Sequence, residues 1–395
     1  MKRLVSVMLI CAFVLSACGK QEPEKDDDKE LQVKETVTPY QYNELSLPDP
    51  LLIDNMEGSD YIGNDFNGFV ADVQGKPGIY YSNFSFEAEE YVSTISRWSL
   101  DENGNWNEEE LCEFSLSEFL NQKYEQLEWM RCKLGNFHRG DNGSLYAVFT
   151  YYLKETKEIE GEDTDMIQQK YSILEIDEEN DSIFEVPLEI GPAASEARRY
   201  DWETAVEWVS DYHVFEDGSV FILSADSGGG YGYLVDGETG QVTDEVGNVV
   251  TGKRRFAFAE SEIIFYSNEK KQFQVLDFPG LEEQNTFGSK LDDSVLGKEW
   301  LFYVNPDTWK MYLCNEGGVY RAAGYQNSDE VEWLTERTDM SEVEQTDSEI
   351  LDFFVGADED FYICMIQTTE EFGQAVKEYR MLHYVKQSDD TPKPD

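Results

Sequence analysis

The chain has 395 residues, of which 82 are Asp or Glu and 31 are Lys or Arg, so its formal net charge is −51. A charge of this size and sign argues against nucleic acid as a partner, and it favours a well-solvated surface. Six cysteines in a chain of this length exclude a disulfide-dense scaffold.

The first residues have the pattern of a secretory signal peptide. Lys2 and Arg3 precede a short apolar run, and Leu15-Ser16-Ala17-Cys18 places small residues directly before a cysteine. This stretch resembles the signal of bacterial lipoproteins. The resemblance implies cleavage before Cys18, acylation of the Cys18 thiol with chains such as palmitate, and an address on the outer face of the cell membrane. An uncleaved membrane helix is the alternative, but the run is shorter than the roughly 20 residues that span a bilayer.

Composition then divides the chain into four parts. We expect a signal peptide over 1–17, a disordered acidic tether over 18–36, a folded domain over 37–386 and a disordered tail over 387–395. The tether is rich in Lys, Glu and Asp and has no aromatic residue, a composition that cannot build a core. After residue 37, Tyr, Phe and Trp become frequent and short β-rich runs recur between Gly, Asp and Asn turns.

The β-rich runs are apolar on both faces, which indicates strands that are covered on both sides. Leu145–Phe149 and Phe361–Ile366 are examples. Helical crossovers are nearly absent, since only 109–131 and 195–209 look amphipathic. Antiparallel sheets that are buried on both faces require stacking of sheet on sheet, and a β-propeller stacks them radially.

An internal repeat supports this all-β interpretation. A Gly- or Asp-rich turn precedes an apolar strand in Gly140–Leu145 and again in Phe215–Val220, and a hairpin with an Asp near its turn follows. From Ser219 onward the apolar strands start about 43 to 50 residues apart, the span of a four-stranded blade. We therefore predict a β-propeller of about six blades, five to seven being possible, with one or two short helical insertions. The predicted blades cover 58–110, 125–190, 200–247, 250–290, 295–337 and 348–386.

The segment from Val37 to Leu47 looks like a strand without a partner of its own, and it is a candidate outer strand that closes the last blade. Two packed β-sandwiches are the competing architecture.

The cysteines and histidines point to no metal or cofactor. Cys314 and Cys364 end apolar runs and are predicted to be buried thiols, whereas Cys112 and Cys132 could pair. The three histidines in the chain are too few and too scattered for a histidine-rich metal site. The turn that begins at Asp101 has some oxygen ligands of a calcium loop, but its Gly is misplaced, so a structural turn is the favoured interpretation.

Aromatic side chains supply the candidate ligand-binding residues. Trp202 and Trp208 could form a stacking platform for a sugar ring, and inter-blade packing is the alternative. Tyr231 and Tyr233 follow the glycine-rich stretch 226–230 and could line a ligand face. No helix follows these glycines, so they do not form a phosphate-binding loop. The sequence has no catalytic motif that stands out, and we expect no catalytic residue.

The lipobox at Cys18, the acidic tether and blades such as Met311–Arg321 together resemble the N-terminal propeller-like region of Gram-positive extracellular solute-binding lipoproteins. In that family a solute-binding α/β module follows and delivers its ligand to an ABC importer. Here no such module follows the blades.

The resemblance implies a membrane-anchored, non-catalytic binding or scaffold propeller linked to uptake of carbohydrate or peptide. Importer components or a solute-binding protein are the implied partners. A glycan-acting hydrolase or lyase is the first alternative. A structural surface protein or a truncated solute-binding lipoprotein is the second.

Overall fold

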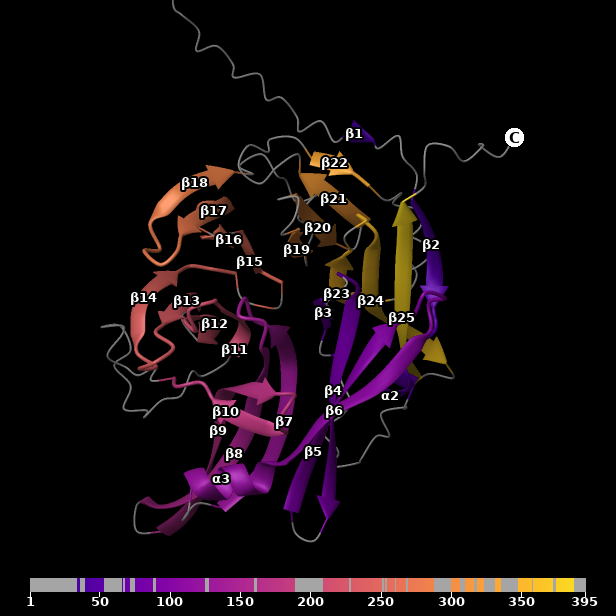
Figure 1. Ribbon diagram of the computed structural model, residues 1–395. Helices are drawn as coiled ribbons and strands as arrows, with labels where there is room; N and C mark the ends of the chain where they lie inside the picture. Colours follow the sequence, from indigo (N-terminus) through magenta and orange to yellow (C-terminus); the bar gives the residue numbers. More distant parts are fainter. Residues whose placement is uncertain are drawn as a thin grey trace, which may run out of the picture. The chain divides into compact units, whose positions relative to one another are not determined.

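A computed structural model gives the fold (Figure 1). The described residues lie between 34 and 386, and the longest gaps among them are 53–65, 189–208, 288–299, 323–330 and 335–346. All of them belong to one compact unit. They form six sheets of four or five strands, which pair antiparallel apart from one short parallel pair at the edge of one sheet. The chain is therefore a six-bladed β-propeller, as the sequence predicted.

Each blade has four strands that are consecutive in the chain, apart from the outermost strand of blade 6. Blade 1 contains β3 (Phe69–Ala71), β4 (Pro77–Glu87), β5 (Glu90–Leu100) and β6 (Trp106–Ser115); blade 2 contains β7 (Glu128–Arg139), β8 (Leu145–Ile159), β9 (Glu162–Asp177) and β10 (Ser182–Glu185); blade 3 contains β11 (Val209–Val214), β12 (Val220–Asp226), β13 (Gly229–Val235) and β14 (Val242–Gly247). Blade 4 contains β15 (Phe256–Ala259), β16 (Glu262–Ser267), β17 (Gln272–Asp277) and β18 (Glu283–Phe287); blade 5 contains β19 (Trp300–Val304), β20 (Met311–Asn315), β21 (Gly318–Ala322) and β22 (Val331–Trp333); blade 6 contains β23 (Asp347–Val355), β24 (Phe361–Glu371), β25 (Gln374–Lys386) and β2 (Tyr40–Leu45).

The ring closes at blade 6 with a strand from the start of the domain. Strand β2 pairs antiparallel with β25, from Tyr40 opposite Lys386 to Leu45 opposite Met381. The predicted closing strand is thus observed. The end of the predicted tether differs from expectation, because Lys34 and Glu35 form a short strand, β1, that pairs in parallel with β22 and adds a fifth strand to blade 5.

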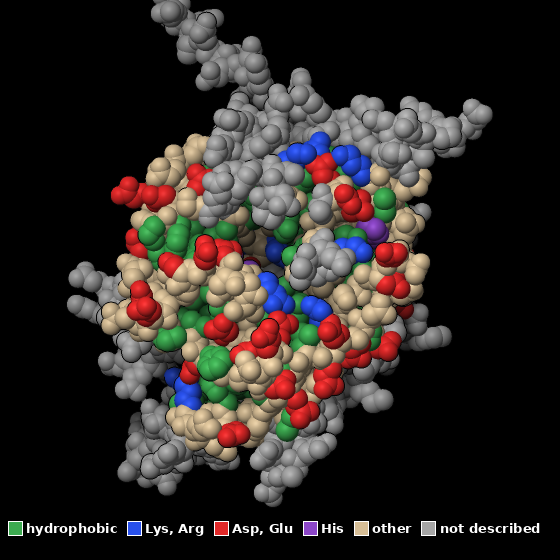
Figure 2. Space-filling view, viewed as in Figure 1, with side chains coloured by type: hydrophobic (Ala, Val, Ile, Leu, Met, Phe, Trp, Pro, Cys, Tyr) green, Lys and Arg blue, Asp and Glu red, His purple; other side chains and the backbone are tan. Residues whose placement is uncertain are grey.

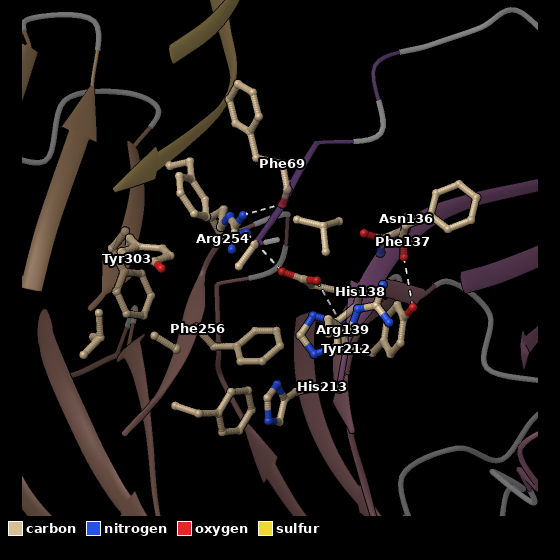
Figure 3. A pocket seen from close by; sticks show the side chains of 18 of the residues that line it. Phe69, Asn136, Phe137, His138, Arg139, Tyr212, His213, Arg254, Phe256 and Tyr303 are labelled. Carbon is tan, nitrogen blue, oxygen red and sulfur yellow. Dashed lines mark hydrogen bonds between the residues drawn. The ribbon is translucent and has the colours of Figure 1, made fainter. Parts of the chain in front are cut away.

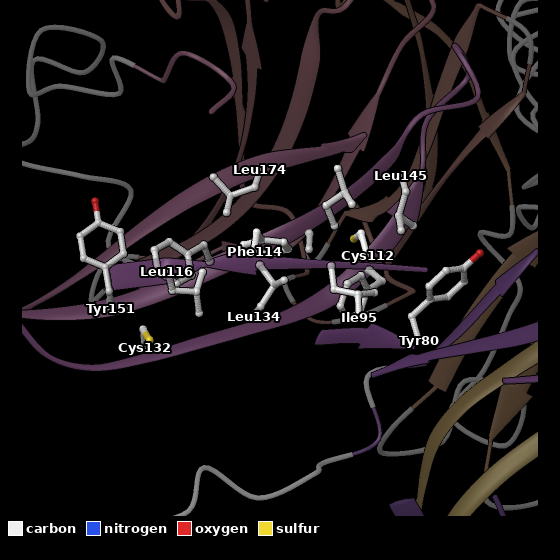
Figure 4. Close-up of a cluster of buried hydrophobic side chains, with 14 of the residues drawn as sticks. Tyr80, Ile95, Cys112, Phe114, Leu116, Cys132, Leu134, Leu145, Tyr151 and Leu174 are labelled. Atoms are coloured by element: carbon white, nitrogen blue, oxygen red, sulfur yellow. The ribbon is translucent and has the colours of Figure 1, made fainter. Parts of the chain in front are cut away.

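The blades pack face to face through large apolar side chains. One cluster joins blades 1 and 2 and includes Ile95, Leu134 and Leu174 (Figure 4). Similar clusters join blades 2 and 3, 5 and 6, and 6 and 1. Central strands are covered on both faces; in β12, for example, Val220 to Leu223 are all fully buried. This packing is the reason for the doubly apolar runs in the sequence.

The predicted Asp-containing hairpins connect the third and fourth strands of blades 1, 2 and 3. In each, an Asp at the end of the third strand accepts backbone N–H groups of its own turn: Asp101 from Asn103 and Asn105, Asp177 from Glu179 and Asn180, and Asp236 from Thr239. The side-chain amide of Asn180 also donates to Asp177, and the hydroxyl of Thr239 donates to Asp236. The backbone of Asn105 lowers the pKa of Asp101 most, whereas these two side-chain donors lower the pKa of Asp177 and Asp236 most. Blade 4 carries a fourth copy, in which Asp277 accepts from Glu282 at 2.6 Å. The turn at Asp101 is thus a structural turn, as favoured above.

The predicted helix over 109–131 is wrong in extent. The helix α3 covers only Leu116–Lys123, because 109–115 form most of β6 and the strand β7 begins at Glu128. Ser115 ends the strand and caps the helix, since its Oγ accepts the N–H of Glu118 at 3.1 Å. The other described helix, α2, is the single turn Asp49–Leu52. The second predicted helix, 195–209, lies outside the described residues except for Val209, which begins β11.

All four cysteines of the described part are free and buried. Cys314 and Cys364 are core thiols, as predicted. Cys112 and Cys132 do not pair; both lie in the cluster between blades 1 and 2, where Figure 4 shows their sulfur atoms well apart. Among the helices of the described residues, none has the length and apolarity to cross a membrane.

A close backbone contact within blade 3 gives a testable prediction. A Cβ atom on Gly237 would lie 2.1 Å from the carbonyl oxygen of Gly218, which belongs to the other turn on the same side of the blade. Because backbone must move to make room, we expect Gly237→Ala to lower the free energy of unfolding by about 1–3 kcal/mol in urea denaturation. Gly247→Ala is the matched control, since its Cβ would meet only the Tyr231 ring at 3.6 Å. Equal stability of the two variants would contradict the prediction.

Candidate functional site in the central channel

The innermost strands of all six blades surround a cavity of about 280 Å³ (Figure 3). Successive inner strands contact one another around the ring, for example β3 with β7, β19 with β23, and β23 with β3. The cavity is therefore the central channel of the propeller, the place where this fold commonly binds ligands. Its lining residues come from β3, β7, β11, β15, β19 and β23 and the turns beside them.

The channel lining follows the repeat of the blades. In four blades the residue that opens the turn after the inner strand donates its N–H across the turn; these residues are Gly140, Phe215, Asn305 and Gly356. The residue two positions earlier lines the channel in every case, and these residues are His138, His213, Tyr303 and Phe354. One position of the repeat thus contributes a lining residue in each of these four blades, and the chemistry of that residue differs from blade to blade.

An ion pair fixes the backbone of the channel. Arg254 Nε donates to Asp352 Oδ1 at 3.0 Å, and Arg254 Nη2 donates to the carbonyl of Phe69 at 2.9 Å. Asp352 is fully buried, and its Oδ2 accepts the N–H of Phe69 at 2.9 Å. Asp211 accepts the N–H of Arg254 at 3.0 Å. Burial of Arg254 lowers the pKa of its guanidinium, but the charge and hydrogen bond of Asp352 raise it by more. The net result is a raised pKa. These groups join blades 1, 3 and 6 to the segment that leads into blade 4.

Two histidines lie side by side on the channel wall. The rings of His138 and His213 are 4.9 Å apart between centroids, and His213 stacks on Phe258 at 3.9 Å. The Nε2 atoms of both histidines are buried and make no hydrogen bond within the described part of the chain, although His213 Nε2 lies 3.1 Å from a carboxylate oxygen of Asp141. Burial, together with the neighbouring His213, Arg254 and Arg139, lowers the pKa of His138 well below its ordinary value. His138 is therefore neutral, and its Nε2 is a buried ring nitrogen without a hydrogen-bond partner among the described residues.

The charged and amide groups of the channel lie on one side, whereas aromatic residues surround it. Blades 2 and 3, with Arg254, provide Asn136, His138, Arg139, Asp141, Asp211, His213 and Arg254. All six blades provide aromatic residues, which are Phe69, Phe137, Tyr212, Phe256, Phe258, Phe302, Tyr303 and Phe354. Figure 2 shows basic side chains in and beside the central hollow, with acidic side chains spread over the surrounding surface. The channel is thus less acidic than the surface around it.

Tyr231 and Tyr233, two of the four candidate ligand residues from the sequence, are not among the residues that line this channel. Trp202 and Trp208 lie outside the described residues, so their role stays a prediction, and the same holds for acylation of Cys18. Tyr233 is a core residue with 1% exposure, and Tyr231 is half-buried and stacks on it at 6.0 Å. Tyr233 was expected on a ligand face, but its ring is buried. It lies on β13, a middle strand of blade 3, and packs against residues of blade 2.

The sequence did not predict that two of the three histidines would meet. His138 and His213 are in contact in the channel, whereas His383 lies 3.1 Å from Asp360. The signal was present in the sequence, since each of the two follows an aromatic residue and stands five residues before the turn glycine Gly143 or Gly218. In the described residues no group of three or more His, Cys, Asp and Glu side chains is placed to hold a metal ion.

Several polar groups of the lining are already engaged within the protein. The lining residues include no Ser, Thr, Cys or Lys. Both oxygens of Asp211 accept backbone N–H groups, from Tyr212 and Arg254. Arg139 is paired with Glu178 and also donates to the hydroxyl of Tyr80. Asp141, whose side chain is 46% exposed, remains accessible to a ligand.

No protein-family model matches the chain. No curated protein matches it either. Among solved structures, the Pan2 WD40 domain of Neurospora crassa is 8% identical and covers 89% of this chain and 97% of its own, with a TM-score of 0.39. The Dos1 propeller is 10% identical over 91% of this chain and 96% of its own, with a TM-score of 0.37. A protein from Lactobacillus plantarum is 10% identical over 81% and 88%, with a TM-score of 0.37. At these values the likeness carries no argument about function.

Proposed function

We propose that this protein is a lipid-anchored, extracellular β-propeller that binds a small solute in its central channel without transforming it. The proposal extends to a role in a solute-uptake system for carbohydrate or peptide, with importer components or a solute-binding protein as partners. The anchor rests on the lipobox at Cys18, and the binding role rests on the channel.

The observation that carries the binding role is the combination of aromatic and charged groups in the lining of the channel. The ring of Tyr303 suits a flat apolar surface, and the carboxylate of Asp141, whose side chain is 46% exposed, suits a hydroxyl or amino group. A volume of about 280 Å³ lies at the lower end of the range for ligand pockets. The channel therefore suits one monosaccharide, one amino acid or a dipeptide, rather than a polymer.

A ligand screen tests the binding role. Monosaccharides, amino acids and dipeptides are screened by thermal shift on the purified domain, and positive compounds are titrated by calorimetry. We expect saturable binding that Tyr303→Leu weakens about tenfold or more, because the ring face is lost. Phe184→Leu is the matched control, since Phe184 lies on the outer strand β10 and is 56% exposed. Binding that both variants leave unchanged would place the ligand elsewhere. Turnover of a polysaccharide would favour the hydrolase or lyase alternative.

The anchor is tested separately in a bacterial host. Cys18→Ser removes the only thiol that the lipobox presents for acylation, so we expect the variant to incorporate no labelled palmitate and to leave the membrane fraction. Cys11→Ser, within the signal segment, is the matched control and should be acylated as the wild type is. Membrane retention of Cys18→Ser with undiminished labelling would contradict the anchor.

A further inference from the structure

One carboxylate of the central channel is open to a ligand. Asp141 lies in the turn after β7 and lines the channel, and its side chain is 46% exposed. Its backbone N–H donates to the carbonyl of Val214 at 3.0 Å, which fixes this turn of blade 2 against blade 3. His213 Nε2 lies 3.1 Å from Asp141 Oδ2, but the two atoms make no hydrogen bond. Both carboxylate oxygens of Asp141 can therefore accept hydrogen bonds from a ligand.

The arginines of the channel lining are already balanced by carboxylates. Arg139 Nη1 pairs with Glu178 at 2.8 Å, and Arg254 Nε pairs with Asp352 at 3.0 Å. A second carboxylate, Asp211, accepts the backbone N–H of Arg254 at 3.0 Å. The described lining includes no lysine. An anion that enters the channel would therefore meet no unpaired cation among the described residues, whereas a cation would meet an open carboxylate.

The rest of the protein favours the same sign of ligand. The formal net charge of the chain is −51, and acidic side chains surround the central hollow in Figure 2. A field of this sign raises the concentration of small cations near the channel and lowers that of anions. Aromatic rings from all six blades line the cavity, and the negative faces of such rings attract an ammonium group. The open carboxylate, the rings and the overall charge thus favour one class of ligand.

We propose that the channel selects a small solute with a protonated amino group, which binds Asp141 while the apolar remainder lies against the aromatic lining. This inference rests on the proposed function and names the class of its solute. An ammonium group has three N–H donors, so it can reach both oxygens of the carboxylate, and these hydrogen bonds are charge-assisted. A hydroxyl in the same place forms a weaker, neutral bond. A cavity of about 280 Å³ limits the solute to one small amine.

Three probes of similar size test the selectivity. These are 2-phenylethylamine, 2-phenylethanol and phenylacetate, which carry a cation, a neutral hydroxyl and an anion on the same ring. Each is titrated by calorimetry into the full chain at constant ionic strength. We expect saturable binding of the amine, binding of the alcohol that is about tenfold or more weaker, and no measurable binding of the acid. Equal affinity for the amine and the alcohol overturns the proposal.

Two variants of the carboxylate locate the amine. Asp141→Asn keeps the shape of the side chain and removes its charge, so the preference for the amine over the alcohol should fall to about twofold or less. Asp141→Glu keeps the charge and should retain a preference for the amine. Glu216→Gln is the matched control, because Glu216 is exposed in the corresponding turn of blade 3 and does not line the channel. An equal loss of preference in Asp141→Asn and Glu216→Gln would indicate attraction by the surface charge alone and would overturn the proposal.

The inference and the proposed function can fail separately. If solutes from the ligand screen bind wild type and lose affinity in Tyr303→Leu, while 2-phenylethylamine binds no better than 2-phenylethanol, the binding role stands and the preference for an amine is wrong. If neither the screened solutes nor 2-phenylethylamine bind, both are wrong. Binding of 2-phenylethylamine that Asp141→Asn and Tyr303→Leu each weaken supports both.

Discussion

Asp352→Ala is expected to destabilise the propeller by about 3–5 kcal/mol, as measured by urea denaturation. The substitution leaves the guanidinium of Arg254 without its carboxylate and removes the acceptor of the Phe69 N–H, both in the centre of the ring. Removal of one partner from a buried ion pair costs far more than the pair contributes, because the remaining charge stays desolvated. The effect is large because three blades depend on these groups.

A double variant distinguishes this reason from simple loss of packing. Asp352→Leu combined with Arg254→Met replaces both charges with apolar groups, and we expect it to be more stable than Asp352→Leu alone. Asp244→Ala is the surface control, because Asp244 is exposed on the outer strand β14, and its effect should stay within about 0.5 kcal/mol. A double variant that is less stable than the single one would show that the ion pair is not the cause.

Low pH should weaken the contact between blades 5 and 6. Glu359 in the turn between β23 and β24 forms ion pairs with Lys310 and Arg321 of blade 5 and with Lys386 of blade 6, and these are lost when its carboxylate is protonated. Its pKa is about 2 in the folded protein and near the ordinary value of 4.5 when unfolded. A lowered pKa means that the carboxylate stabilises the fold fully above about pH 5, and that this contribution is lost as the pH falls toward 2. The shift corresponds to about 3 kcal/mol. We expect denaturation curves of the wild type to lose this amount between pH 5 and pH 2.

Glu359→Gln should be less stable than the wild type by a similar amount, about 3 kcal/mol, at pH 7, and the difference should vanish near pH 2. Glu283→Gln is the matched control, because Glu283 pairs with one exposed lysine on blade 4. Its effect should stay below about 1 kcal/mol at every pH. A difference between wild type and Glu359→Gln that does not change with pH would contradict the role given to this carboxylate.

The propeller could be predicted from the sequence because its determinants are local. Each turn before an apolar strand and each Asp after a third strand is a short motif with its own hydrogen bonds, and these motifs repeat at the span of a blade. The fourth Asp copy, at Asp277, was missed because its turn contains Pro279 and resembles the others less. The closing strand could be predicted because an apolar, aromatic segment at the domain start had no partner nearby.

The helix and the channel show what local patterns do not determine. The segment 109–115 is amphipathic at helical spacing, but blade 1 needs a fourth strand, and pairing with β5 overrides the local preference. The channel depends on which side chains meet from six blades, and contacts such as that between His138 and His213 appear only when the ring is closed. When the sequences of the blades are aligned on their turns, His138 and His213 fall at the same position. This shared position is the one sign in the sequence that the two residues lie near each other.

The closing strand also determines how the ring responds to a mechanical load. Tyr40, where the chain enters β2, is paired with Lys386, where β25 ends, so both ends of the chain leave the blade at the same edge. The hydrogen bonds of an antiparallel pair lie perpendicular to the strands. Tension between the two ends of the chain would therefore unzip β2 from β25 one bond at a time, instead of shearing all of them together. At the first of these pairs, the Glu359 carboxylate contacts Lys386 and its backbone carbonyl accepts the Tyr40 hydroxyl. Glu359 therefore stabilises the end of the β2–β25 pair that would separate first.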